Sequence, residues 1–446
     1  MRKIDINKLI DEARFNPFHL RVLFWATLIL IFDGYDLVIY GVVLPTLMQE
    51  WGLTPVQAGT LGSCALFGMM FGALILGPLA DKVGRKPVIV GGIALFSLFT
   101  VLTGFCTDPT QFGICRFIAG FGIGGVMPNA VALMSEYAPK KLRSTLVAIM
   151  FSGYSVGGMI SAGLGVVLLP SFGWQSLFYV AAIPILLLPM IYRSLPESVG
   201  FMVRQGRAVE ASHVMQSIEP GYVPRANDDY STPTLKTAGA PLMQLFREGR
   251  AISTLLLWTS CFCCLLMIYA LGSWLPKLMV NAGYGLGSSI MFLLVLNFGA
   301  IVGAIGGGWL GDRFKLRNVV VVFFVIAAIS ISSLGFNPPT VILYALVAIA
   351  GASTIGTQIL AWAFVAQFYP MTIRSTGLGW ASGIGRTGAM VGPILGGVLV
   401  GIQLPLHFNF MVFALPGAVA ALAMCFVYQR QSKTQPQASA SAVLQD

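Results

Sequence analysis

The sequence contains little charge. Only 10% of its 446 residues are Asp, Glu, Lys or Arg, while 56% are hydrophobic. Soluble domains carry about 25% charged residues, so this chain cannot cover a surface that faces water. We therefore predict an integral membrane protein with twelve apolar segments, most of them close to the ~20 residues that cross a bilayer. The predicted spans are about 20–46, 57–80, 87–106, 110–135, 143–169, 174–193, 251–276, 287–311, 318–336, 340–367, 374–401 and 406–428.

The sequence also lacks the residue patterns of enzymes. It has three His, no cluster with metal-ligand spacing and no Walker string, so ATP-driven chemistry is unsupported. All seven Cys fall in predicted apolar spans, and the CFCC stretch at 261–264 has no partner His or second Cys pair, which indicates packing. The glycine string at 116–125 follows no strand, so it indicates close helix packing rather than a nucleotide site. We predict no enzyme activity, no cofactor and no metal.

Positive charge lies mainly on one side of the predicted membrane. With the N-terminus placed in the cytoplasm, 24 of the 27 Lys and Arg residues fall in cytoplasmic segments, the exceptions being Lys277 outside and Arg116 and Arg386 within spans. Cytoplasmic loops carry this excess, so we expect both termini in the cytoplasm. The net charge of +10 then reflects orientation, and no nucleic-acid partner is expected. The N-terminus does not resemble a signal peptide, because it contains Asp5, Asp11 and Glu12 and because the first apolar run is too long and lacks a cleavage site.

The two halves of the chain repeat each other. An ungapped shift of 231 residues aligns many identical positions, including Gly41 with Gly272, Gly68 with Gly299, Asp81 with Asp312, Gly120 with Gly351 and Arg143 with Arg374. Six spans per copy give both copies the same orientation, and two-bundle transporters of this kind bind substrate between the halves near the midplane. We predict an all-α fold of two six-helix bundles, at 1–195 and 251–430, with a cytoplasmic connecting loop at 196–250 and a disordered cytoplasmic tail at 431–446.

Two acidic residues interrupt the first span. Asp33 and Asp36 lie in FDGYDLVIYG, and each costs roughly 2.5–3.5 kcal/mol at the centre of a membrane helix. At helical spacing they are neighbours, so two carboxylates in a low dielectric resist joint ionisation and at least one should bind a proton readily. Alternatively, one Asp caps a helix break at Gly34 or pairs permanently with Arg116. The second half has no acid at the equivalent positions.

Arg386 is a lone cation in the eleventh span. No acid occurs in the later spans, so its partner is either an Asp of the first half or an anionic substrate. We favour a substrate carboxylate, which matches the planar fork of a guanidinium, with Arg116 as a competing anion site. Aromatic and amide side chains around the predicted cavity favour a flat ligand with one carboxylate. The candidate lining residues are Phe32, Tyr35, Tyr40, Asn297, Gln358, Trp362, Phe364 and Trp380.

GPLADKVGRK at 77–86 resembles the loop signature of the major facilitator superfamily, and GWLGDRFKLR at 308–317 is its second copy. The resemblance implies that Asp81 and its basic neighbours form an ion-pair latch that holds one alternating-access state and breaks in the other. Positive-inside anchoring is the plainer interpretation, but it leaves the glycines and Asp81 unexplained. The implied gating residues are Gly77, Asp81, Gly84, Arg85, Lys86, Asp312, Arg313 and Arg374.

The D-G-Y-D of the first span is similar to the signature of the aromatic acid:proton symporter family within this superfamily, and FDGYDLVIYGVVLP resembles benzoate transporters. The resemblance implies that Asp33 and Asp36 are required for transport, that Arg116 and Glu136 belong to the proton-coupling set, and that Arg386 binds substrate. We expect a monomeric symporter that imports benzoate or a related acid with protons across a bacterial inner membrane. A proton-coupled exporter of small organic anions and a non-transporting sensor of aromatic acids remain alternatives.

Overall fold

A computed structural model describes residues 2–223, 228–231, 242–247, 249–336, 338–370 and 373–428. Within these residues, twelve helical segments are long and apolar enough to cross a membrane, which confirms the predicted number of spans. They are α2 (Pro17–Glu50), α3 (Pro55–Val83), α4 (Arg85–Thr103), α5 (Pro109–Tyr137), α6 (Arg143–Phe172), α7 (Gln175–Tyr179) together with α8 (Ala182–Ser194), α11 (Ala251–Asn281), α12 (Leu286–Arg313), α13 (Leu316–Leu334), α14 (Thr340–Phe368), α15 (Arg374–Gly401) and α16 (Leu406–Phe426).

Local sequence explains where several spans begin. Asn16 caps α2 by accepting hydrogen bonds from the backbone N–H groups of Phe18 and His19. Thr54 caps α3 in the same way and Asp108 caps α5. Each cap is followed by proline, whose missing N–H costs nothing in the first turn of a helix. These polar N-caps fix the residue at which each apolar helix begins.

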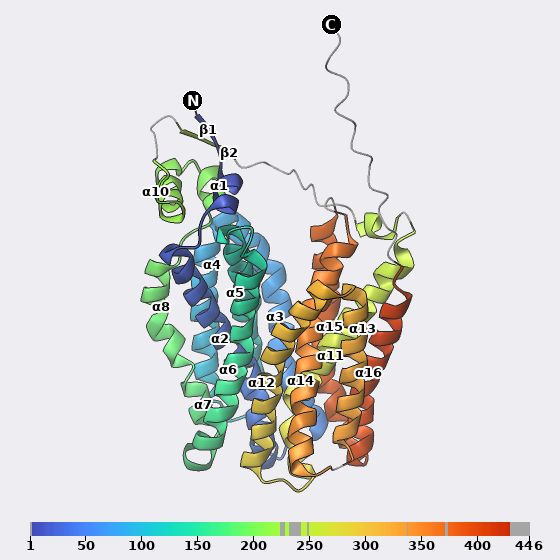
Figure 1. The fold of residues 1–446 in the computed structure, drawn as a ribbon. Coiled ribbons are helices and arrows are strands. Elements are labelled where there is room, and N and C mark those ends of the chain that lie inside the picture. Colours follow the sequence, from blue (N-terminus) through green and yellow to red (C-terminus); the bar gives the residue numbers. More distant parts are fainter. Residues whose placement is uncertain are drawn as a thin grey trace.

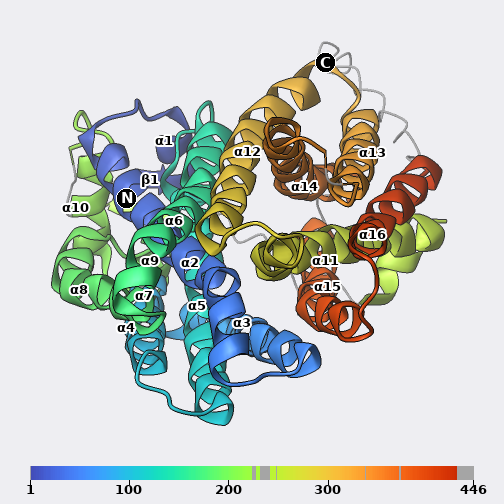
Figure 2. The same cartoon turned by 90° about the horizontal axis from the view of Figure 1, so that it is seen from below.

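The helices form two groups, α2–α8 and α11–α16, which lie side by side (Figures 1 and 2). The 231-residue repeat reappears as matching contacts between helices. A Cβ atom at Gly68 of α3 would lie 1.9 Å from the Phe117 carbonyl oxygen of α5, and one at Gly299 of α12 would lie 2.0 Å from the Ala348 carbonyl oxygen of α14. Both glycine and partner are shifted by 231 residues. The duplication therefore preserves the packing geometry as well as the sequence.

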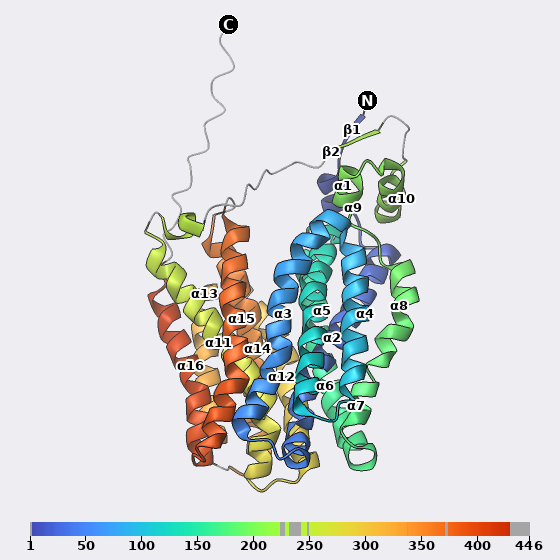
Figure 3. The ribbon, with the colours of Figure 1, turned by 180° about the vertical axis from the view of Figure 1, so that it is seen from behind.

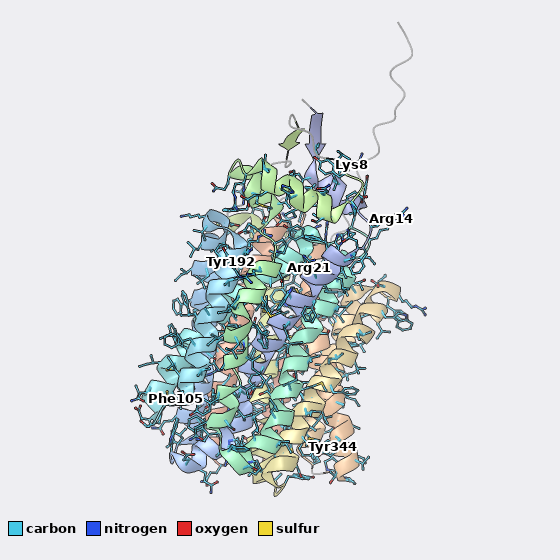
Figure 4. All side chains as sticks on the ribbon, turned by 90° about the vertical axis from the view of Figure 1, so that its left-hand side faces the viewer. Lys8, Arg14, Arg21, Phe105, Tyr192 and Tyr344 are labelled. Carbon is cyan, nitrogen blue, oxygen red and sulfur yellow. The ribbon has the colours of Figure 1, made fainter. Side chains whose placement is uncertain are left out.

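The two ends of the bundle differ. The basic end carries the N-terminal tail with Lys8 and Arg14, and the distal end carries Phe105 and Tyr344 (Figure 4). The groups meet through α3 with α15, α6 with α12 and α2 with α11. Contact is close from the middle of the spans towards the distal end, where a Cβ at Gly41 would lie 1.9 Å from the Gly272 carbonyl oxygen.

At the basic end, three glycines of α3, α12 and α15 show no such contact. A Cβ atom added at Gly77 of α3, Gly308 of α12 or Gly379 of α15 would have no neighbour within 4 Å. Figure 3 shows α3 and α15 converging towards the distal end. The structure is therefore closed between the two groups at the distal end and open at the basic end.

Beside the first group, the basic end holds a small cap built from the N-terminal tail and the connecting segment. Strands β1 (Arg2–Asp5) and β2 (Asp228–Ser231) pair in parallel, and the cap also contains α1 (Ile6–Glu12), α9 (Val199–Arg204) and α10 (Ala208–Ile218). A short 3-10 helix, η1 (Leu242–Phe246), precedes α11.

Buried residues of β1, α1 and α10 belong to one apolar cluster, and the Asn16 amide donates to the Ile218 carbonyl oxygen at 2.8 Å. Asp11 accepts from Arg143 at 2.5 Å, which ties the tail to the start of α6. The sequence predicted only a polar tail and connector here. The predicted disordered tail at 431–446 lies outside the described residues.

Candidate transport site

Asp36 and Arg116 form a buried ion pair inside the first group. The Nη1 atom of Arg116 donates to both carboxylate oxygens of Asp36 at 2.9 Å, and Nη2 donates to the Asp36 carbonyl oxygen at 2.9 Å. Thr100 donates a further hydrogen bond to the same carboxylate. Both charged side chains are nearly fully buried, at 1% exposure. Both oxygens of the Asp36 carboxylate thus have hydrogen-bond donors. This agrees with the alternative that one Asp of the first span pairs permanently with Arg116.

Asp33 has a different environment. Its side chain is 1% exposed, and neither carboxylate oxygen has a hydrogen-bond partner. An ionised carboxylate without a donor is very costly to bury, so these surroundings favour the neutral acid. The helix α2 runs unbroken from Pro17 to Glu50, which excludes the alternative of a helix break at Gly34.

Two tyrosines connect Asp33 to the second group. Gly34 packs so closely on α6 that a Cβ there would lie 1.9 Å from the Tyr154 carbonyl oxygen. The Tyr154 hydroxyl on α6 and the Tyr269 hydroxyl on α11 are neighbours, and Asp33 lies near both. Tyr269 packs against the apolar cluster of the first group, so this pair of hydroxyls spans the boundary between the two groups.

Arg386 is a further neighbour of Tyr269. It occupies the middle of α15, is partly accessible, and interacts electrostatically with the Tyr269 phenol. Four ion pairs occur among the described residues, and none includes Arg386. The site therefore brings together Asp33, Tyr154, Tyr269 and Arg386, and combines a carboxyl that favours its neutral form with a guanidinium that has no carboxylate partner among the described residues.

Other predicted binding residues lie in varied surroundings. Tyr35 donates to the Leu177 carbonyl oxygen at 2.7 Å and Tyr40 donates to that of Ala58, so both hydroxyls are already bonded within the first group. Asn297 donates to the Leu293 carbonyl oxygen at 2.9 Å and lies against Gly158 of α6, on the boundary between the groups.

The remaining lining candidates come from α2, α14 and α15. Trp380 is 42% exposed and stacks on Trp258 with ring centroids 5.7 Å apart. Gln358 and Trp362 are half-buried on α14. Phe32 is half-buried on α2 and Phe364 is buried on α14. Among the described residues, none of these five side chains forms a hydrogen bond or a ring contact with Arg386.

The gating residues form a network at the basic end. Arg85 donates to Glu136 at 2.5 Å, and Glu136 also accepts from the Ser198 hydroxyl at 2.6 Å. Glu197 accepts from the backbone N–H groups of Arg85 at 2.8 Å and Lys86 at 3.3 Å. Glu136 lies 20 residues from Arg116 along α5, which is about 30 Å of helix. Glu136, which was predicted to belong to the proton-coupling set, therefore lies beside the predicted gating residue Arg85 and far from the buried ion pair.

The expected latch at Asp81 is not formed in this conformation. Asp81, Asp312 and Arg313 are exposed, and none takes part in an ion pair within the described chain. Arg313 stacks on Trp309, while Arg374 is half-buried at the start of α15. An open basic end agrees with a latch that has separated.

Gly84 explains one position of the loop signature. Its φ is +103°, and a Cβ there would lie 2.4 Å from the Glu197 carboxylate. Any other residue would be strained and would displace Glu197 from the N–H groups of Arg85 and Lys86. Gly77 in the same signature has no neighbour in this conformation.

A protein-family comparison decides the identity of this fold. The model of the Major Facilitator Superfamily matches residues 26–310 and 295–445. The chain belongs to the major facilitator superfamily. It is accordingly a multi-pass membrane transporter and not an enzyme.

Several curated relatives in this superfamily are similar along nearly the whole chain. A benzoate transport protein of Acinetobacter baylyi is 49% identical over 98% of this chain and 95% of its own length. A gentisate transporter of Corynebacterium glutamicum is 39% identical over 90% of this chain and 86% of its own length. The 4-hydroxybenzoate transporter PcaK of Pseudomonas aeruginosa is 35% identical over 95% and 96%.

Solved major facilitator structures share the fold at low sequence identity. A bacterial homologue of the human lysosomal transporter Spinster, in an inward-facing occupied conformation, gives a TM-score of 0.72 at 17% identity, covering 93% of this chain and 97% of its own. The Escherichia coli xylose transporter XylE, in a partially occluded inward-open conformation, gives 0.71 at 18% identity, covering 94% and 100%.

Tyr154 and Tyr269 were not among the predicted site residues of this transporter. Tyrosines in apolar spans usually serve packing, and no charge marks these two in the sequence. A usable signal exists only for Tyr154, which lies in the small-residue stretch GYSVGG, where close helix approach brings a hydroxyl near α2.

Proposed function

We propose that this protein is a proton-coupled symporter that imports an aromatic carboxylate, with benzoate as the first candidate. The proposal rests on the cluster of polar side chains at the boundary between the two groups. In this cluster, the Asp33 carboxyl has no hydrogen-bond donor and Arg386 has no carboxylate partner among the described residues. The named substrates of the relatives, all aromatic carboxylates, support the substrate class.

The substrate carboxylate docks on Arg386. A guanidinium presents two parallel N–H donors that match a carboxylate, and such a bidentate contact fixes the orientation of the ligand. Arg116 is the other buried cation of the spans, and its Nη1 and Nη2 donors are already directed to Asp36. Arg386 is therefore the guanidinium with donors to offer.

Charge balance couples the substrate to a proton. A closed site with an anion on Arg386 and a proton on Asp33 is neutral, and so is an empty site in which Asp33 is ionised and Arg386 is charged. A site with substrate and no proton carries one uncompensated negative charge, and a site with a proton and no substrate carries one positive charge. Burying either costs several kcal/mol, so only the neutral states reorient.

We propose further that the basic end faces the cytoplasm of a bacterium whose inner membrane holds the protein as a monomer. The excess of Lys and Arg at this end supports that orientation. With both termini in the cytoplasm, the conformation described above is inward-open.

Uptake of labelled benzoate into right-side-out membrane vesicles tests the proposal. Accumulation that disappears when the proton gradient is collapsed is the expected result. Accumulation that ignores the gradient rules out symport, and absence of uptake of every aromatic acid rules out the substrate class. Net outward flux in the same vesicles would identify an exporter, and saturable binding without flux would identify a sensor.

A further inference from the structure

Two cysteines lie in contact at the distal end of the first group. Cys106 is three residues beyond the end of α4, and Cys115 is in the second turn of α5. Their Sγ atoms are 3.8 Å apart, with the Cys106 thiol donating to the Cys115 sulfur. Cys106 therefore lies outside the third span, although the sequence predicted that this span reaches residue 106.

The pair lies at an end of the molecule where oxidation can occur. Phe105, the neighbour of Cys106, is at the end opposite Lys8 and Arg14 (Figure 4). If the basic end faces the cytoplasm, the pair faces the periplasm, where disulfides form and persist. Both cysteines are only half-buried, so a reagent can reach them from outside.

We propose that Cys106 and Cys115 are a modification site that is oxidised to a disulfide bond. This inference rests on the orientation given in the proposed function. A disulfide requires the two sulfur atoms to approach to about 2.05 Å, which is a movement of less than 2 Å from the observed contact. Rotation of the two side chains supplies it, because Cys106 is in a connection rather than inside a helix.

The oxidant is a second disulfide, carried by a protein or a small molecule. The thiolate of one cysteine attacks a sulfur of that disulfide, which releases a thiolate and forms a mixed disulfide. The other cysteine then attacks its neighbour's sulfur, forms the Cys106–Cys115 bond and releases the second sulfur of the oxidant. Two thiols of this protein lose two protons and two electrons, and the oxidant becomes two thiols.

The environment of the pair makes uncatalysed oxidation slow. Burial, and then the neighbouring Cys115 thiol, raise the pKa of Cys106 to about 12. Little Cys106 thiolate is present at neutral pH, and the thiolate is the reactive form. We therefore expect a protein disulfide to oxidise the pair efficiently, and a small disulfide to react faster as the pH rises.

The bond would fasten α4 to α5 without linking the two groups. It closes a short loop that contains Asp108, whose carboxylate caps α5 by accepting from the N–H groups of Thr110 and Gln111. Because α4 and α5 belong to the same group, the disulfide does not restrict the movement of one group relative to the other. Reduction should lower the thermal unfolding midpoint by roughly 2–4 °C and leave transport intact.

Sequential thiol labelling of the full-length protein tests the inference. Cells are quenched in acid, free thiols are blocked with N-ethylmaleimide under denaturing conditions, and the protein is then reduced and labelled with a polyethylene-glycol maleimide. We expect two labels that depend on reduction in the wild type, none in Cys106→Ser or Cys115→Ser, and two in the control Cys425→Ser.

Absence of reduction-dependent labels in the wild type, or their persistence in Cys106→Ser, overturns the inference. The proposed orientation is tested separately by treating reduced right-side-out vesicles with a maleimide that cannot cross the membrane. Labelling of Cys106 in Cys115→Ser from outside keeps the orientation, whereas labelling only after permeabilisation rejects it. Uptake of benzoate by both serine variants is measured separately, so loss of the disulfide is not mistaken for loss of the proposed function.

Discussion

Arg116 donates to both carboxylate oxygens of Asp36 at 2.9 Å, and protein surrounds the pair completely. The pair separates the roles of the two acids of the first span. Asp36 is held by Arg116 and Thr100, whereas Asp33, one helical turn away, has no donor. Two residues that look equivalent in the sequence are thus expected to respond differently to the same substitution.

Asp36→Asn should destabilise the protein. The substitution leaves the buried Arg116 guanidinium without its counter-charge, and removing one partner of a buried pair costs about 3–5 kcal/mol. Thermal unfolding of the purified protein in detergent measures this, with Asp81→Asn as the control because Asp81 is exposed. Equal midpoints for Asp36→Asn and the control would show that the pair does not hold the bundle together.

Asp33→Asn should leave the fold intact, because the amide resembles the neutral acid that this site favours. We expect an unfolding midpoint close to that of the wild type. Exchange of benzoate across the membrane should persist, while accumulation above equilibrium and its dependence on external pH should be lost. Measuring counterflow and accumulation on the same proteoliposomes separates the two, and retained pH-driven accumulation would remove Asp33 from the proton pathway.

Arg386→Lys should weaken benzoate binding although the charge remains. A lysine is a point charge and cannot make the two parallel hydrogen bonds of a guanidinium. Loss of a hydrogen bond to a charged group costs about 1.5–3 kcal/mol, so the Kd should rise roughly 10–100-fold. Calorimetric titration of the purified protein measures the change, with exposed Arg313→Lys as the control. An unchanged Kd would move the anion site away from Arg386.

Tyr154→Phe and Tyr269→Phe should show non-additive losses. Each removes one hydroxyl of the same neighbouring pair, so the second substitution has little left to disturb. We expect both single variants to slow proton-coupled uptake several-fold and the double variant to be no slower than the worse single one. Initial uptake rates of the four proteins form the cycle. Independent, multiplying losses would mean that the two hydroxyls do not act together.

Gly84→Ala and Gly77→Ala lie within one loop signature but should affect different properties, stability for the first and transport rate for the second. Alanine at Gly84 meets a strained φ and the Glu197 carboxylate, so the unfolding midpoint should fall by an amount that corresponds to about 1–3 kcal/mol. Alanine at Gly77 meets nothing in the open conformation, but α3 must approach the second group when the basic end closes. Gly77→Ala should therefore keep its stability and transport slowly. Normal uptake by Gly77→Ala would contradict closure at this point.

Much of the architecture could be predicted from apolar runs and the 231-residue repeat, because lipid requires long helices and duplication preserves their contacts. Gly68 and Gly299 show this directly, since each meets the equivalent carbonyl of its own half. The sequence also marked Asp33, Asp36, Arg116 and Arg386 as costly charges. It did not determine which Asp pairs with Arg116, because that choice depends on Thr100 and on the mutual rotation of α2, α4 and α5.

The cap at the basic end could not be predicted from the sequence either. Its contacts join segments about 130 to 230 residues apart, such as Asp11 with Arg143 and Asn16 with Ile218. Short polar segments carry weak patterns, and their structure arises only when a surface is available for docking. The conformation with an open basic end likewise depends on contacts between the groups, which no local pattern encodes.

The central claim is that Asp33 carries the proton that accompanies the substrate. The direct measurement is the external pH of a weakly buffered suspension of proteoliposomes when benzoate is added, compared for wild type, Asp33→Asn and protein-free liposomes. The liposomes give the background from diffusion of the undissociated acid. We predict extra alkalinisation with the wild type only, while Asp33→Asn still exchanges labelled benzoate in proteoliposomes that are preloaded with benzoate. Equal alkalinisation by wild type and Asp33→Asn would contradict the account.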